Sequence, residues 1–174
     1  MSQAMLRTKI EDLVKQYADL KFQQQNFDPE SDRVSVTGKV IGSRELVNMV
    51  NASLDGWLTA GRFNSAFEAK LSKWLGVKHL LTVNSGSSAN LVALSTLTSP
   101  KLGTRAIKSG DEVISVAGGF PTTINPIIQL GAVPVFVDLE LATHNINVDQ
   151  VEDAITDKTK AVMLAHALGN PFDA

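Results

Sequence analysis

The chain contains no cysteine among its 174 residues. Disulfide bonds, thiolate metal sites and iron–sulfur clusters held by these residues are therefore excluded. No apolar run reaches the roughly 18 residues that a membrane-spanning helix needs. Residues 1–21 alternate polar and apolar side chains where a signal peptide would have an apolar core. We therefore expect a cytoplasmic protein with no membrane segment.

An excess of charge of either sign is also missing. The 16 lysines and arginines nearly balance the 18 aspartates and glutamates, and the net charge is -2. The chain as a whole therefore does not attract nucleic acid, and we expect no nucleic-acid partner. Hydrophobic residues make up 44% and charged residues 20%, as in ordinary globular proteins. Any anion that binds must be held by local groups.

The usual nucleotide-binding loops are absent as well. Neither G-x-G-x-x-G nor G-x-x-x-x-G-K-[ST] occurs, so the chain lacks the signatures of dinucleotide and Walker-type sites. A smaller phosphate group is the better candidate ligand. None of the three histidines has a second histidine at metal-ligand spacing, and we predict no metal site.

The first part of the chain predicts an arm outside the main domain. Apolar residues at helical spacing over residues 6–20 predict an amphipathic helix. The polar segment at 23–42 contains turn formers and a possible extended piece at 34–40. We therefore divide the chain into an N-terminal helical arm with an extended segment, residues 1–42, and an α/β domain, residues 43–174.

The α/β domain is predicted from two helices followed by a regular alternation. One helix is expected from Ser43 to Gly56, and another from an S-x-x-E capping box at Ser65 and Glu68 to Gly76. Apolar runs then alternate with helical patterns. The expected strands are 79–83, 112–117, 133–137 and 161–165, and the expected helices are near 91–97, 121–130 and 148–155. This order predicts an α/β fold with a largely parallel sheet and helices on both faces.

The segment TVNSGSSAN, residues 82–90, is the most informative about chemistry. A predicted strand ends there, a turn of small residues follows and a helix begins, so backbone N–H groups and the helix dipole favour an anion. Ser85, Ser87 and Ser88 can add hydroxyl donors, and Gly86 lets a ligand approach the backbone closely. A phosphate site is one interpretation. A plain capped turn, which favours the same residue types, is the other.

Two further candidates follow predicted strands, at the sheet edge where ligands of α/β proteins collect. Phe120 lies in AGGFPTTINP, and its ring could stack on a flat cofactor or fill the core between helix and sheet. His166 is either a site residue or a hydrogen-bonded structural histidine. His79 and His144 are most simply surface residues.

Five segments together resemble the sugar aminotransferase and dehydratase family of fold-type I vitamin B6 enzymes. They are GWLTAGRFNSAFE (56–68), SGSSAN (85–90), GDEVISVAGGFPTTINPI (110–127), PVFVDLE (134–140) and AHALGNPFD (165–173). The arm, the run GSSANLVALSTLTSPKLGTRAIKSGDEVI and the run GFPTT resemble the branch of 3-dehydrases that act on CDP-4-keto-6-deoxyglucose in lipopolysaccharide synthesis. The implied fold is the N-terminal part of the large domain of a fold-type I PLP-dependent transferase.

The resemblance implies a pyridoxamine 5′-phosphate (PMP) or pyridoxal 5′-phosphate (PLP) cofactor and a nucleotide-sugar substrate. Gly86 and Ser87 would hold the cofactor phosphate, and Phe120 would stack on the pyridine ring. The expected cofactor-binding residues are Ser85, Gly86, Ser87, Ser88, Phe120 and His166. The expected neighbours of the sugar nucleotide are Thr59, Gly61 and Arg62.

No residue of the chain matches the family's catalytic groups. The resemblance places the aspartate that pairs with the pyridine nitrogen after Ala174. The resemblance also places the catalytic position after Ala174, where aminotransferases have a lysine and dehydrases a histidine. The cysteines of an iron–sulfur cluster are expected in the same later part. We therefore expect an N-terminal fragment of a protein that in full length is a homodimer served by an NADH-dependent iron–sulfur flavin reductase. A sugar aminotransferase and a non-catalytic fragment stay open as alternatives.

Overall fold

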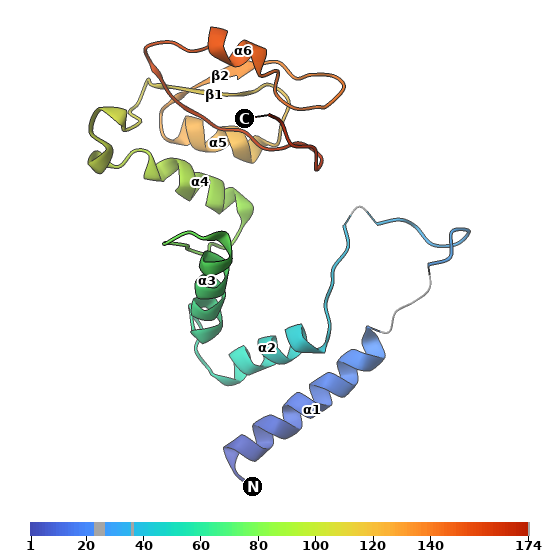
Figure 1. Ribbon diagram of the computed structural model, residues 1–174. Helices are drawn as coiled ribbons and strands as arrows, with labels where there is room; N and C mark the ends of the chain where they lie inside the picture. Colours follow the sequence, from blue (N-terminus) through green and yellow to red (C-terminus); the bar gives the residue numbers. More distant parts are fainter. Residues whose placement is uncertain (23–26, 36, 174) are drawn as a thin grey trace. The chain divides into compact units, whose positions relative to one another are not determined.

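The computed structural model of the chain describes residues 1–22, 27–35 and 37–173. Two compact units, Met1–Leu81 and Thr82–Ala174, are described separately (Figure 1). The first contains α1 (Gln3–Lys21), α2 (Ser43–Leu54) and α3 (Arg62–Leu75). The second contains α4 (Gly86–Thr96), the 3-10 helix η1 (Pro100–Arg105), β1 (Glu112–Val116), α5 (Pro121–Gln129), β2 (Val133–Val137), α6 (Asp149–Asp153) and β3 (Thr159–Val162). No helix within the described residues is long and apolar enough to cross a membrane.

In the first unit, polar side chains join α1 to α2. The Arg7 guanidinium donates to Asn51 Oδ1 at 2.9 Å and to Asp55 Oδ1 at 3.0 Å. Asn51 is buried and donates from Nδ2 to Glu11 Oε1 at 2.7 Å. The helix predicted over residues 6–20 is therefore confirmed, and hydrogen bonds fasten it to α2. The predicted domain division after residue 42 stays a prediction.

The segment between α1 and α2 contains no strand in the part that the structure describes, 27–35 and 37–42. The predicted extended piece includes residue 36, which lies outside the described residues, as do 23–26. α2 begins at Ser43 as predicted. Its first turn is capped because Glu45 Oε2 accepts the Gly42 amide at 2.8 Å.

α3 begins earlier than its predicted capping box. Its first residue is Arg62, its N-cap is Gly61, and Ser65 is already inside the helix, so the predicted start was wrong. The extra turn forms because Arg62 Nε donates to Asp55 Oδ2 at 2.7 Å, which fixes the first helical residue. The helix ends as predicted at Gly76, which adopts a left-handed φ of 70°.

The second unit is built on a three-stranded parallel sheet in the order β2-β1-β3. In the central strand, Val113 lies opposite Pro134 of β2 and Ala161 of β3. Along the chain, α5 connects β1 to β2, and α6 connects β2 to β3. β3 begins two residues before the predicted start at residue 161 and ends at Val162.

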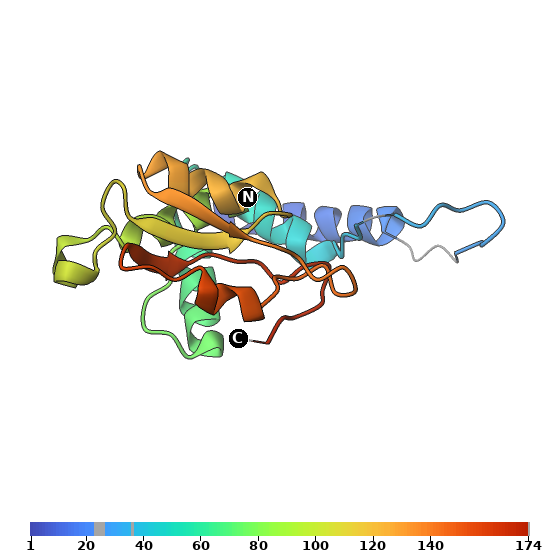
Figure 2. The same cartoon turned by 90° about the horizontal axis from the view of Figure 1, so that it is seen from above.

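Helices cover both faces of this sheet. On one face, Val113 packs with Leu94 of α4 and Ile127 of α5. Because successive strand residues point to opposite faces, Ile114 belongs to a second cluster, against which Val151 of α6 packs. Both views show α5 and α6 on opposite sides of the strands (Figures 1 and 2). The predicted α/β fold with a parallel sheet and helices on both faces is confirmed.

The strand predicted at 79–83 does not form. These residues have no regular secondary structure, and Leu81 and Val83 are 80% and 41% exposed. A strand needs a neighbour that accepts and donates its backbone hydrogen bonds, and the described sheet offers none to this segment. Apolar composition alone was therefore not sufficient to form a strand here.

Candidate cofactor-phosphate site

The turn at Ser85–Ser88 forms the N-terminus of α4, which has 11 residues. Ser85 is the N-cap, and its Oγ accepts the Ser88 amide and donates to Ser88 Oγ, both at 3.2 Å. The first amides of a helix have no acceptor within the helix. The cap therefore uses the Ser88 amide and leaves those of Gly86 and Ser87 for an external acceptor. The first turn holds no acidic residue, so the helix dipole favours an anion there.

This turn is open rather than filled by packed side chains. Ser85, Gly86 and Ser87 are exposed, and Ser88 is half-buried. A methyl group on Gly86 would meet no atom within 4 Å. The space in front of the amides can therefore admit a group of the size of a phosphate ester.

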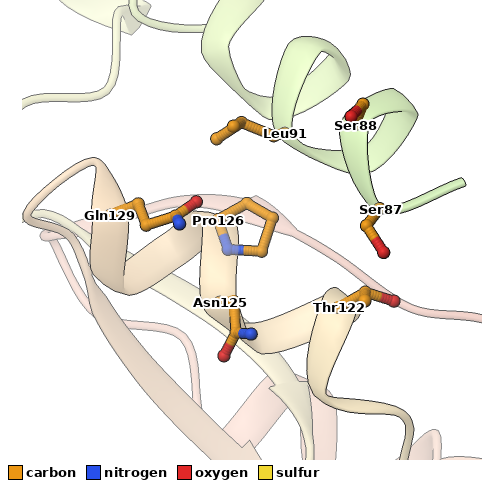
Figure 3. Close-up of a pocket in the computed structure, with 7 residues that line it drawn as sticks. All are labelled: Ser87, Ser88, Leu91, Thr122, Asn125, Pro126 and Gln129. Carbon is orange, nitrogen blue, oxygen red and sulfur yellow. The ribbon is translucent and has the colours of Figure 1, made fainter. Parts of the chain in front are cut away.

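α4 and α5 line a cavity of about 160 Å³ beside the turn. Its lining residues are Ser87, Ser88, Leu91, Thr122, Asn125, Pro126 and Gln129. Figure 3 shows the Ser87 and Thr122 side chains facing each other at one end, with Leu91 and Pro126 farther along. Polar side chains thus lie at both ends of the cavity, Ser87 and Thr122 next to the α4 N-terminus and Gln129 at the far end.

A hydrogen bond between the two helices fixes these walls. Asn90 Nδ2 of α4 donates to the Thr122 carbonyl oxygen of α5 at 3.2 Å. That carbonyl would ordinarily accept the amide four residues later in its own helix. The residue at that position is Pro126, which has no N–H. The Thr122 carbonyl is therefore available to α4.

A second cavity, of about 270 Å³, lies at the carboxyl end of β1. The backbone there lies close to the next loop, because a side chain on Gly118 would overlap Leu139. Phe120, which precedes α5, is 73% exposed and lines this cavity together with His166. The ring therefore does not fill the core between helix and sheet.

Four of the six predicted cofactor residues, Ser87, Ser88, Phe120 and His166, line two cavities that share the first turn of α5, and Ser85 and Gly86 form the turn beside the first. Ser87 and Ser88 line the first and Phe120 lines the second. Thr122 lines the first and Thr123 the second, and the two are consecutive residues. A ligand with a phosphate at one end and a flat ring at the other would need both cavities.

His166 is exposed and has a partner within the chain. Its Nδ1 accepts the Phe172 amide at 3.2 Å, and the two rings lie 4.2 Å apart at 33°. A neutral imidazole that accepts at Nδ1 carries its proton on Nε2. The hydrogen bond agrees with the interpretation of His166 as a structural histidine. Its place on the cavity wall agrees with the interpretation as a site residue.

His144 is exposed, as predicted, but the sequence did not indicate that it lies beside a cavity. It lines the same cavity as Phe120 and His166. An antiparallel bridge between Leu139 and Ile146 folds the loop after β2 back on itself, and this brings His144 to the sheet edge. The sequence contains no local signal for such a bridge. Within residues 1–22, 27–35 and 37–173, no group of three or more His, Asp or Glu side chains could hold a metal ion.

The predicted substrate neighbours lie in the first unit. Thr59 Oγ1 accepts the Ala60 amide at 2.6 Å, and Gly61 caps α3. The Arg62 guanidinium lies 4.1 Å from the centroid of the adjacent phenyl ring and is bonded to Asp55, which Arg7 also contacts. Hydrogen bonds from Arg62, and then from Arg7, lower the pKa of the Asp55 carboxyl.

Residues 40–174 match the family described as DegT/DnrJ/EryC1/StrS aminotransferases. The chain belongs to this family. The resemblance read from its motifs to sugar aminotransferases and dehydratases is therefore confirmed, and so is the PLP-dependent transferase fold.

Two curated relatives in the DegT/DnrJ/EryC1/StrS family have names that bear on sugar chemistry. The chain is 58% identical over 168 residues to the lipopolysaccharide biosynthesis protein RfbH of Salmonella typhimurium, which covers 97% of this chain and 38% of that protein. It is 50% identical over 144 residues to the dTDP-4-dehydro-2,6-dideoxy-D-glucose 3-dehydratase of Saccharopolyspora spinosa, which covers 83% of this chain and 31% of that protein.

A solved structure of the family holds the expected kind of cofactor. The E. coli GDP-4-keto-6-deoxy-D-mannose 3-dehydratase with bound hydrated PLP is 35% identical, with a TM-score of 0.59 over 66% of this chain and 29% of that chain. The chain thus spans only about a third of the length of the relatives it matches. Sugar-nucleotide dehydratases are among its close relatives.

The residues present fit the phosphate of such a cofactor. The donor set at the α4 N-terminus consists of backbone amides and serine hydroxyls, with no carboxylate in the first turn to repel an anion. These are the groups that bind phosphate at helix N-termini in other proteins. A family cofactor therefore has a chemically suitable place in this chain.

Proposed function

We propose that the chain is the phosphate-binding part of a PMP-dependent 3-dehydratase of nucleotide sugars, acting on CDP-4-keto-6-deoxyglucose on the route to 3,6-dideoxyhexoses of O-antigen. The observation that supports it is the open turn at Ser85–Ser88, which offers backbone amides and serine hydroxyls and has no acidic residue in the first turn of the helix. It occurs in a chain 58% identical to a lipopolysaccharide biosynthesis protein. The choice of CDP is part of the proposal, because named relatives act on dTDP and GDP sugars.

In this proposal each residue has a binding or orienting role. The amides of Gly86 and Ser87 and the Ser87 hydroxyl bind the phosphate, and the exposed Phe120 ring stacks on the pyridine ring. His166, with Nε2 away from its Phe172 contact, lies beside that ring. When bound, the cofactor supplies an amine and an electron-accepting ring. The catalytic residue is not among these positions.

The substrate and partner assignments are further parts of the proposal. Thr59, Gly61 and Arg62 lie near the sugar nucleotide, and Arg62 then shares its guanidinium between Asp55 and the substrate. The cysteine-free chain supplies no thiolates, so an iron–sulfur cluster would be held by other residues of the full-length protein. The NADH-dependent iron–sulfur flavin reductase, the homodimer and the cytoplasmic location stay predictions.

A glycine substitution tests the phosphate site directly. Gly86→Ala adds a methyl group that meets no protein atom, so folding should be unchanged. The same methyl group would occupy the space in front of the amides, and PMP binding should fall by roughly tenfold or more, as for a lost bond to a charged group. The measurement is titration of the chain with PMP, followed by absorbance and by phosphorus NMR.

Two comparisons make that titration specific. Gly38→Ala also adds a methyl group in open space but belongs to the first unit, and this variant should bind PMP like the unmodified chain. Inorganic phosphate should compete with PMP. Equal PMP affinity for Gly86→Ala and Gly38→Ala would show that the turn is not the phosphate site. We expect weak binding and no dehydration by the 174 residues alone, and measured turnover would contradict that part.

A sugar aminotransferase is the second candidate, because the matched family is described by that activity. The two reactions share a phosphate turn and differ in one residue that the chain does not contain. The corresponding full-length gene should encode a histidine at the family's catalytic lysine position. A lysine there would favour the aminotransferase, and the phosphate site would be unaffected.

A further inference from the structure

Two strained backbone positions mark the second cavity. Among the residues that the structure describes, His144 and Leu168 are the non-glycine residues with positive φ, at 56° and 52°. L-residues adopt this region rarely because the Cβ atom crowds the backbone, and such positions cluster at functional sites. Both residues line the cavity that Phe120 and His166 also line. Other interactions must therefore hold two separate loops in unfavourable conformations around one cavity.

Two side chains join those two loops: Asn170 Nδ2 donates to the Thr143 carbonyl at 3.2 Å on the exposed side, and Asn145 makes the buried connection. Asn145 is only 3% exposed. Its Oδ1 accepts the Ala167 amide at 2.9 Å, and its Nδ2 donates to the Asn170 carbonyl at 2.7 Å. Asn145 directly follows His144, and its two partners lie on either side of Leu168. Both ends of a buried amide are therefore used to fasten the loop after β2 to the segment after β3.

We infer that Asn145 is a positioning residue, which holds His144 and His166 on the wall of the Phe120 cavity by clamping the two strained loops together. Residues next to a strained position relax when their hydrogen bonds are removed, because the ordinary φ region lies lower in energy. The turn at 167–170 is closed by its own bond from the Asn170 amide to the Ala167 carbonyl at 2.7 Å, so without the clamp it is expected to move as a whole away from the loop after β2. His166 would then lose its place opposite the loop of His144.

This inference depends on the proposed function in one respect, since it takes the cavity to receive the ring of the cofactor. The clamp itself can be measured without any ligand. The Ala167 amide reports its own bond to Asn145. The Phe172 amide, bonded to His166, reports whether His166 keeps its place, although no atom of that bond belongs to Asn145.

The test compares three variants of the chain by amide hydrogen exchange and by PMP titration. Asn145→Ala should speed exchange of the Ala167 amide about tenfold, as for one lost hydrogen bond. It should also speed exchange at Phe172 and weaken PMP binding severalfold. Asn147→Ala is the matched control, because Asn147 lies on the same loop but bonds only to the Asp149 amide through its side chain. It should change neither amide.

Asn145→Asp keeps the Oδ1 acceptor and removes the donor. Ala167 should stay protected in this variant, while Phe172 exchanges faster because the Asn170 carbonyl has lost its partner. If the β1 amides of Asn145→Ala lose their protection from exchange, that variant has unfolded. The exchange rates of Asn145→Asp then decide whether Asn145 positions His166. Phe172 exchange equal to that of Asn147→Ala would overturn the inference. If the unmodified chain binds no PMP, the proposed function fails, whereas the exchange results still decide the role of Asn145.

Discussion

The two units of the chain are stabilised by different interactions. In Thr82–Ala174 the sheet carries its own core, and Val113, Ile114 and Ile127 are 0% exposed. In the described part of Met1–Leu81 the buried apolar side chain is that of Ala18, and polar bonds centred on Asn51 join the helices. Large apolar side chains remain outside, including Trp57 at 65% and Trp74 at 80% exposed.

The unit Thr82–Ala174, which contains the candidate phosphate turn, can therefore be rigid through its own hydrophobic core. Burial of apolar area is the main favourable term in folding, and it is concentrated around β1. Exposed hydrogen bonds contribute much less. We therefore expect the first unit to open at lower denaturant concentration than the second. Tryptophan fluorescence follows the first unit, which contains both tryptophans, and amide exchange on β1 follows the second.

The largest effect should come from the core of the sheet. Ile114→Ala removes a fully buried side chain between β1 and α6 and should lower the free energy of unfolding by about 2–5 kcal/mol. Leu13→Ala, at a side chain 65% exposed in α1, should change it by less than about 0.5 kcal/mol. Urea titration measures both, followed by exchange on β1 for Ile114→Ala and by tryptophan fluorescence for Leu13→Ala. Equal effects would remove the contrast between the units.

A glycine at the end of α5 should have the next effect. Gly131 has a φ of 74°, and a Cβ there would lie 2.9 Å from Ser109 Oγ. Gly131→Ala should therefore destabilise the second unit by about 1–3 kcal/mol, from left-handed strain and crowding together. Gly110→Ala has the strain without the crowding, since its φ is 86° and nothing lies within 4 Å. Its smaller effect in the same titration would separate the two causes.

A smaller effect is expected where α1 meets α2. Asn51→Ala removes the acceptor of Arg7 and the donor to Glu11 and should cost about 1–2 kcal/mol in the first unit. Exchange of the α1 amides should accelerate, while that of β1 stays unchanged. Asn48→Ala, an exposed position of the same helix, is the control. Acceleration on β1 would mean that the two units unfold together.

The smallest effect concerns the charge of Asp55. Its pKa is lowered by hydrogen bonds from Arg62 and Arg7, so its contribution is present above the ordinary aspartate pKa and is lost as pH falls through the lowered value. The tryptophan fluorescence transition should therefore move to lower urea concentration on acidification. Asp55→Asn should weaken that dependence, whereas Asp12→Asn, at an exposed pair with Lys15, should not.

Local patterns predicted the helices and two strands well. The apolar run at β1 was placed correctly because a strand buried by helices on both faces reads as a continuous apolar run. The run at β2 was also placed correctly, although Val133 and Phe136 of this edge strand are exposed. The run at 79–83 reads in the same way, but it is not part of the sheet in the region that the structure describes. The S-x-x-E pattern at Ser65 failed for a similar reason, since Asp55, a non-local partner, moved the start of α3.

In the candidate site, too, the features that depend on neighbouring residues were predicted, and those that depend on distant contacts were not. The Ser85 cap and the open turn follow from residues adjacent in sequence, and the sequence predicted their geometry. Their role with a phosphate stays a prediction. His144 and Asn145 join the cavity wall only because the Leu139–Ile146 bridge and the contacts to 167–170 form. Such contacts depend on the folded sheet and leave no periodic trace in the sequence.

Pro126 has one more consequence for anyone who would redesign this chain. A proline within a helix is commonly treated as a defect, and alanine as its repair. Here Pro126→Ala would place a backbone N–H within reach of the Thr122 carbonyl. That N–H would compete with the Asn90 side-chain amide for the same oxygen. A more regular α5 would therefore be a less firmly attached neighbour of α4.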